Sequence, residues 1–135
     1  MLQSFSIDTH HQQLIEISHQ AQALLSQTDT NSGLLTLFIK HTSASLIIQE
    51  NADPSVQTDL LNWMNRLVPE NNRLFTHTSE GPDDMPAHIK SMLTQTSVSI
   101  PFDQGRLMLG TWQGVFLFEH RSGSHQRYII AHSQA

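Results

Sequence analysis

The feature that most constrains this fold is a short segment that is apolar on both faces of a predicted strand. In residues 111–120, TWQGVFLFEH, two-residue alternation places aliphatic side chains on one face and aromatic side chains on the other: Val115 and Leu117, then Trp112, Phe116 and Phe118. A strand that is apolar on both faces is normally buried on both sides. We therefore expect a sheet that lies between layers of structure or between subunits.

Other patterns along the chain predict a mixed fold. Alternation and turn residues predict strands over residues 4–8, 34–41, 43–50, 96–102, 106–110 and 126–132. Helical spacing predicts helices over residues 12–28, from Asp53-Pro54 to Val68-Pro69, and from about Asp84–Pro86 onward. At 135 residues, one domain with its own core is expected. We predict a single α+β domain, residues 1–135, with a compact, mostly antiparallel, β-sandwich-like sheet and two to three helices.

The charge balance argues against nucleic acid as a partner. The chain has 7 Lys+Arg and 12 Asp+Glu, a net charge of −5 with neutral histidines, so we do not expect it to bind nucleic acid through a basic face. Charged residues make up 14% of the chain, against about a quarter in typical domains. Because a surface poor in charge is often covered by other subunits, we expect an oligomer.

The composition also bears on location and chemistry. Cysteine is absent, so a metal ion would be bound by histidine, aspartate or glutamate. No apolar run approaches the roughly 20 residues that span a bilayer, and the first residues lack the pattern of a signal peptide. We expect a cytoplasmic protein without a membrane partner.

Side chains that could carry chemistry gather in three clusters. The first lies at the two ends of one predicted strand and contains His41, Thr42, Ser43, Glu50, Asn51 and Asp53. The second, in HTSEGPDDMPAHIK, contains His77, Glu80, Asp83, Asp84, His88 and Lys90. The third contains Gln113, Glu119, His120, Arg121 and Arg127.

Three histidines of these clusters stand at the margins of predicted buried faces. His41 closes the apolar face of its strand, His77 lies on a loop, and His88 lies on the helix that follows. Neutral imidazoles that converge in a dry cleft are good metal ligands, so these three form a candidate metal site. A histidine at the end of an apolar strand is also often a hydrogen-bonded structural residue, and both interpretations stay open.

Asp53 likewise has two interpretations. Before Pro54 it is well suited to cap the following helix, because its carboxylate can accept hydrogen bonds from the first free backbone N–H groups. As a charged residue it could instead line a cleft. We expect capping to be its main role.

Four segments resemble the motifs of one protein family. They are HTSASLIIQENADPSVQTDL (residues 41–60), SEGPDDMPAHIKS (79–91), GRLMLGTWQGVFLFEHR (105–121) and RYII (127–130). From Gly33 onward the chain is similar to the YjbQ family, whose members are often named secondary thiamine-phosphate synthases. Two positions differ: many relatives have glycine at Gln95, and many have Phe-Asp at His120-Arg121.

The resemblance implies a compact α+β fold that assembles as a homotrimer, with clefts at the subunit junctions. His41, His77 and His88 match family histidines that are regarded as a metal site, where zinc is favoured and magnesium is an alternative. Further residues that fall on family motif positions are Glu50, Asn51, Asp53, Glu80, Trp112, Gln113, Glu119 and Arg127.

The resulting hypothesis is an enzyme with secondary thiamine-phosphate synthase activity. It would join an aminopyrimidine diphosphate to a thiazole phosphate, with a divalent metal ion acting on the diphosphate and Glu80 as the acid or base. Lys90 and Arg127 would receive phosphate oxygens, and Thr42 and Ser43 would help to line the cleft. Two alternatives remain: a metal-assisted hydrolase, and a non-catalytic trimer that holds a metal ion or a small metabolite.

Overall fold

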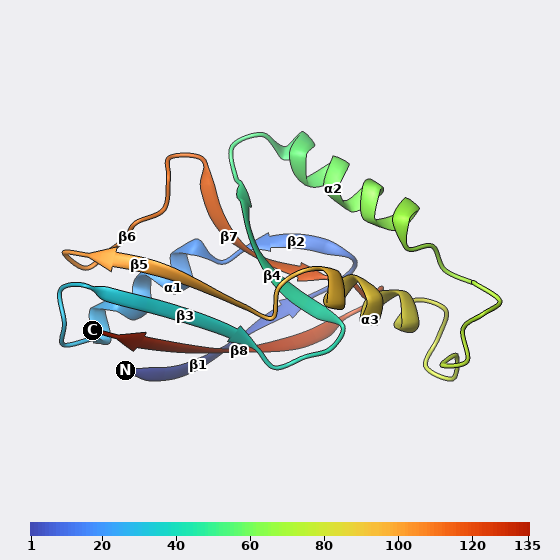
Figure 1. Cartoon of the computed structure of the whole chain (residues 1–135), viewed down its shortest axis with the longest axis horizontal. Helices are drawn as coiled ribbons and strands as arrows, with labels where there is room; N and C mark the ends of the chain where they lie inside the picture. The colour runs from blue at the N-terminus through green and yellow to red at the C-terminus, as the bar shows by residue number, and fades with distance from the viewer.

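The computed structural model describes residues 1–135 as two antiparallel sheets and three α-helices (Figure 1). The larger sheet has the strand order β1 (Leu2–Thr9), β8 (His125–Gln134), β3 (Gly33–Ile39), β5 (Ser97–Asp103) and β6 (Arg106–Leu107). The smaller sheet has the order β2 (Gln13–Glu16), β7 (Gln113–Glu119) and β4 (Ala44–Glu50). The helices are α1 (Ser18–Leu24), extended by a 3-10 turn, α2 (Pro54–Leu67) and α3 (Asp84–Leu93). The predicted α+β class is confirmed.

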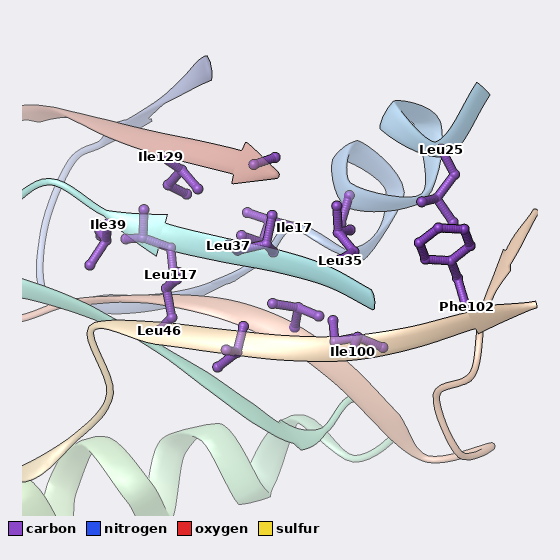
Figure 2. Close-up of a cluster of buried hydrophobic side chains, with 14 of the residues drawn as sticks. Ile17, Leu25, Leu35, Leu37, Ile39, Leu46, Ile100, Phe102, Leu117 and Ile129 are labelled. Atoms are coloured by element: carbon purple, nitrogen blue, oxygen red, sulfur yellow. The ribbon is translucent and has the colours of Figure 1, made fainter. Parts of the chain in front are cut away.

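The main core lies between the two sheets (Figure 2). Alternate residues of β3 and β5 face it, among them Leu37 and Ile100, and Leu46 and Leu117 face it from the smaller sheet. Burying such aliphatic side chains contributes roughly 1.5–3 kcal/mol each, which makes this layer the main source of stability. Helix α1 adds further apolar side chains at one end of the layer.

Strand β7 is covered on both faces within one chain. Val115 and Leu117 face the main core, and Phe116 and Phe118 form a second cluster with Leu14 and with Met64 of α2. The predicted burial of this strand on both sides is confirmed. Its cover is a layer of the same molecule.

The prediction of one helix over residues 12–28 is wrong in its first part. Residues 13–16 form strand β2, which pairs with residues 116–119 of β7, and the helix begins only at Ser18. Leu14 and Ile17 have a spacing that suits a helix, but each is buried in a different cluster. The free edge of β7 therefore outweighs the local helical pattern.

The predicted strand over residues 106–110 is shorter in the structure. Only Arg106 and Leu107 pair with β5, opposite Asp103 and Phe102. The backbone N–H of Met108 still donates to the carbonyl of Pro101 at 2.8 Å, but proline has no N–H to return, and the ladder ends there. None of the helices combines the length and the hydropathy that a membrane-spanning helix needs.

Three distant segments meet at one end of the sandwich. The chain leaves β3, bends at residues 40–43 and enters β4, where the backbone N–H of His120 donates to the carbonyl of Ser43. His88 of α3 contacts the carbonyl of Thr42, and Arg121 contacts Asp83 just before α3. This end of the molecule carries the candidate site.

Candidate metal site

Three potential ligand side chains converge at the start of α3. Single atoms of His77, Asp84 and His88 lie within 4.8 Å of one another. The Nε2 atom of His77 is 2.8 Å from Oδ2 of Asp84, and Nε2 of His88 is 3.2 Å from the same oxygen. Asp84 and His88 are four residues apart in one helix, so they stand on the same face. The chain therefore brings two imidazoles and one carboxylate to a single point.

The tautomer of His88 determines whether a cation can bind between His88 and Asp84. Its Nδ1 lies 3.1 Å from the carbonyl oxygen of Thr42, which can only accept, so Nδ1 carries the proton. In the neutral ring, Nε2 then presents a lone pair toward Asp84 Oδ2, which is also an acceptor. A cation between the two atoms, or a second proton on His88, is needed to make this contact favourable. Metal-binding histidines are typically oriented by such a bond from the other ring nitrogen.

Asp84 is buried, with only 3% of its side chain exposed. Burial acts to raise the pKa of this carboxyl, but the hydrogen bond from His77 and the charges of His88 and Arg121 outweigh it and lower the pKa. The group therefore stays an anion, which is the form that binds metal ions.

Glu80 lies beside the cluster and is more accessible. Its Oε2 is 3.9 Å from Nε2 of His77, and 59% of its side chain is exposed. The loop turns at Gly81, whose φ of 105° lies in the region that favours glycine. Glu80 is thus placed to exchange protons with a bound molecule or to approach a metal ion.

His41 is not part of the converging group, which in a single chain consists of His77, Asp84 and His88. The Nε2 atom of His41 accepts a hydrogen bond of 2.8 Å from the backbone N–H of Tyr128, which occupies the lone pair that a metal would need. Burial and the charge of Arg127 lower the pKa of His41, so the ring is neutral. The structural interpretation fits His41 within a single chain.

Arg127 and Glu119 form a buried ion pair behind His41. Nε of Arg127 donates to Oε1 of Glu119 at 2.7 Å, and the hydroxyl of Thr9 donates to the same oxygen at 2.6 Å. Burial acts to raise the pKa of Glu119, but hydrogen bonds from Arg127 and Thr9 lower it. Because the guanidinium of Arg127 is buried and paired with Glu119, it is not exposed to receive a phosphate group in a single chain.

Lys90 is buried as well. Its Nζ donates to Oδ1 of Asn65 at 2.5 Å, only 3% of the residue is exposed, and burial lowers its pKa. The predicted phosphate contact from Lys90 is therefore not available on the surface of a single chain. Of the neighbouring loop residues, Thr42 is exposed, whereas Ser43 is buried and contributes its carbonyl to Arg127.

The remaining predicted site residues gather at the opposite end of β4. Seven strand residues separate the two ends, about 20 Å at the usual rise per residue. Here Asn51 donates to Glu16, Gln113 accepts from the backbone of Gly110, and Trp112 is exposed. The carboxylate of Glu50 accepts a hydrogen bond from the backbone N–H of Asp53. Asp53 in turn caps α2. The residues that the sequence analysis grouped in its first cluster therefore lie at two separate places within a single chain.

Two clefts adjoin the three converging side chains. One, of about 490 Å³, is lined by Phe38, Ile39, Lys40, His41, Thr42, His88, Ser91, Met92 and Thr96. The other, of about 370 Å³, lies on the side of His77 and Gly81. The first offers a free cation, Lys40, together with hydroxyl groups and an apolar wall.

The sequence analysis listed Asp84 in the second cluster but did not count it among the metal ligands, although it lies at the centre of the converging group. Its spacing of four residues from His88 was a usable signal. Arg121 was also missed as a partner of Asp83 and Asp84, because it lies 38 and 37 positions away and meets them only in the folded chain.

The fold and the site together define a two-sheet α+β protein with a histidine–carboxylate cluster at one end of the sandwich. A family model described as "UPF0047 protein YjbQ-like" matches residues 3–135, and the chain belongs to the YjbQ/UPF0047 family. A UPF0047 protein of Synechocystis sp. is 51% identical over 142 residues, which cover 98% of this chain and 97% of that protein. The YjbQ protein of Escherichia coli is 50% identical over 75% of this chain and 72% of its own.

Solved structures of relatives have the same fold. A YjbQ/UPF0047 family protein from Clostridium acetobutylicum, described as uncharacterized, has a TM-score of 0.90 at 28% identity, covering 98% of this chain and 99% of that chain. A conserved hypothetical protein from Thermus thermophilus has a TM-score of 0.88 at 33% identity, again covering 98% and 99%.

Proposed function

We propose that this chain binds a divalent metal ion through His77, Asp84 and His88 and acts there on a small phosphorylated metabolite. The observation that carries the proposal is the contact between Nε2 of His88 and Oδ2 of Asp84, two acceptors 3.2 Å apart. Ligands of a tetrahedral zinc ion, at 2.0–2.1 Å from the metal, stand about 3.3 Å apart. The separation and the chemistry of the donors both suit such an ion.

Zinc is favoured over magnesium by the ligand types. Two imidazole nitrogens and one carboxylate are typical of zinc, whereas magnesium prefers oxygen ligands and retains several waters. When bound, the ion would supply a Lewis acid for a phosphate oxygen. Glu80 is the candidate acid or base, since it stands beside His77 on the exposed side of the cluster.

The cleft that His88 shares with Lys40 is the proposed place for the metabolite. Lys40 is exposed and would attract an anionic group, and Ser91 and Thr42 would offer hydrogen bonds. Lys40 thus takes the role that the sequence analysis assigned to Lys90 and Arg127, which are buried.

The reaction to test first is the one that the family resemblance implies, the joining of an aminopyrimidine diphosphate to a thiazole phosphate. A metal-assisted hydrolase or a non-catalytic binding protein would use the same side chains. Glu80→Gln separates the enzymes from the binding protein. We expect the variant to keep its metal and its fold but to lose turnover, and a variant with undiminished turnover would remove Glu80 from this role.

Metal binding itself is tested by measuring zinc content and affinity in three variants, His77→Ala, Asp84→Asn and His88→Ala. We expect each substitution to lower zinc affinity by more than about tenfold, because each removes one ligand of the set. His19→Ala is the matched control, since His19 is an exposed histidine on α1 far from the cluster in sequence. If zinc affinity in the three cluster variants equals that of the wild type and of His19→Ala, these side chains do not bind the ion and the cluster is structural.

A further inference from the structure

We propose that Arg121 is a positioning residue that holds Asp84 as a one-oxygen ligand and thereby makes the site select zinc over larger divalent cations. This inference rests on the metal site proposed above. The proposal concerns the arginine of this chain.

Arg121 is held in place from several directions. Its Nε lies 3.2 Å from Oδ2 of Asp83, and its Nη2 donates to the carbonyl of Glu80 at 2.7 Å. The backbone N–H of Arg121 donates to Oε2 of Glu119 at 3.0 Å, and that carboxylate is itself paired with Arg127. The guanidinium is therefore anchored both to the end of β7 and to the loop that precedes α3.

The remaining guanidinium nitrogen lies near the carboxylate of Asp84 and forms an ion pair with it. Nη1 of Arg121 lies 3.4 Å from Oδ1 of Asp84, whereas both histidines approach Oδ2. The two oxygens of one carboxylate are thus used differently. Because arginine stays charged at all ordinary pH values, it withholds Oδ1 from any cation that sits between His77 and His88.

The number of carboxylate oxygens matters for the choice of ion. Zinc in proteins usually has four ligands. One oxygen of Asp84 and two imidazole nitrogens supply three of them, and the fourth position is left for a bound molecule. Calcium and manganese suit sites rich in oxygen, and calcium often takes both oxygens of a carboxylate. Without Arg121, Asp84 could turn and offer both oxygens, and larger ions would bind relatively better.

A second role for Arg121 must be separated from this one. The same contacts with Asp83 and Glu80 hold the loop that carries His77, so loss of Arg121 could weaken the site merely by loosening that loop. A loosened loop would lower the affinity for all metal ions by a similar factor. Only the ratio of affinities for two ions reports the use of Asp84 oxygens.

The experiment measures zinc and manganese affinities by competition with a chromophoric chelator in the wild type, Arg121→Gln and Arg121→Lys. Arg106→Gln is the matched control, because Arg106 is an exposed arginine on β6. We expect Arg121→Gln to reduce the ratio of zinc to manganese affinity by about tenfold or more, in the range of other residues that orient metal ligands. Arg121→Lys should restore part of the ratio, since an ammonium group can still occupy Oδ1.

The outcomes separate this inference from the proposed function. If the wild type binds neither zinc nor manganese, the proposed metal site itself is wrong. A wild type that binds zinc, with variants in which both affinities fall by the same factor, would show that Arg121 only holds the loop. Circular dichroism of each variant checks the fold, and Arg121→Lys keeps the test decisive if Arg121→Gln fails to fold.

Discussion

At the scale of single residues, buried polar groups set what this end of the molecule can do. His120 is an example outside the metal cluster: its Nε2 contacts the hydroxyl of Ser45 at 2.8 Å, while its Nδ1 is buried without a partner. Burial, aided by the charge of Lys90, lowers the pKa of His120 to about 3. A histidine that cannot accept a proton in the folded state makes stability depend on pH.

The direction of this dependence follows from the two pKa values. In the unfolded chain His120 takes up a proton below about pH 6.5, but the folded chain does not until about pH 3. Stability therefore falls as the pH falls between these values, by about 2 kcal/mol from pH 7 to pH 5 for this group. Urea unfolding at pH 7 and pH 5 gives the free energy of unfolding at each pH. Between these two pH values, His120→Phe should lose about 2 kcal/mol less of this free energy than the wild type does. An equal loss in both proteins would mean that His120 is protonated in the folded state.

At the scale of elements, the residue that caps helix α2 lies apart from the candidate metal site. Asp53 precedes Pro54 and its Oδ1 accepts from the backbone N–H of Ser55 at 2.9 Å, so the predicted N-cap is confirmed. This cap stands at the end of β4 that is remote from His88. Its contribution should therefore appear in stability and not in metal affinity.

For Asp53 we predict that asparagine replaces aspartate with little loss, because its side-chain oxygen can also accept from Ser55. Asp53→Ala should lower Tm by roughly 3–5 °C, the usual effect of losing a cap in a domain of this size. Zinc affinity should be nearly unchanged in both variants. A large loss of zinc affinity in Asp53→Asn, with Tm preserved, would instead make its charge part of the site.

The elements also show how far the sequence could predict this fold. The alternation around Leu37 and Ile100 and the cap at Asp53 are local patterns, and the strands and the helix start that they predict are all present. Strand β2 was missed because Leu14 has a helical spacing, and only the distant edge of β7 decides its conformation. Asp84 and Arg121 were missed as partners for the same reason, since their contact exists only after α3 packs against β4.

At the scale of the whole molecule, an apolar groove bears on assembly. A cleft of about 470 Å³ runs between α2, β4 and the end of α3, and Trp63, Leu67 and Leu93 on its walls are each about half exposed. The burial of β7 no longer argues for subunits, because α2 covers its outer face. The apolar groove and the low content of charged residues are the features of the chain that favour self-association.

We predict a homotrimer, as the family resemblance implies, with this groove at or near the contact between copies. Sedimentation equilibrium at micromolar concentration should give three times the chain mass of 15.2 kDa. Leu67→Gln should weaken the association and leave the monomer folded, because about half of this side chain is exposed in the single chain. Arg106→Gln is a control, because Arg106 is exposed on β6 and lines neither this groove nor the cleft of Lys40. A wild type that sediments as a monomer would exclude the trimer, and a trimer unaffected by Leu67→Gln would place the contact on another face.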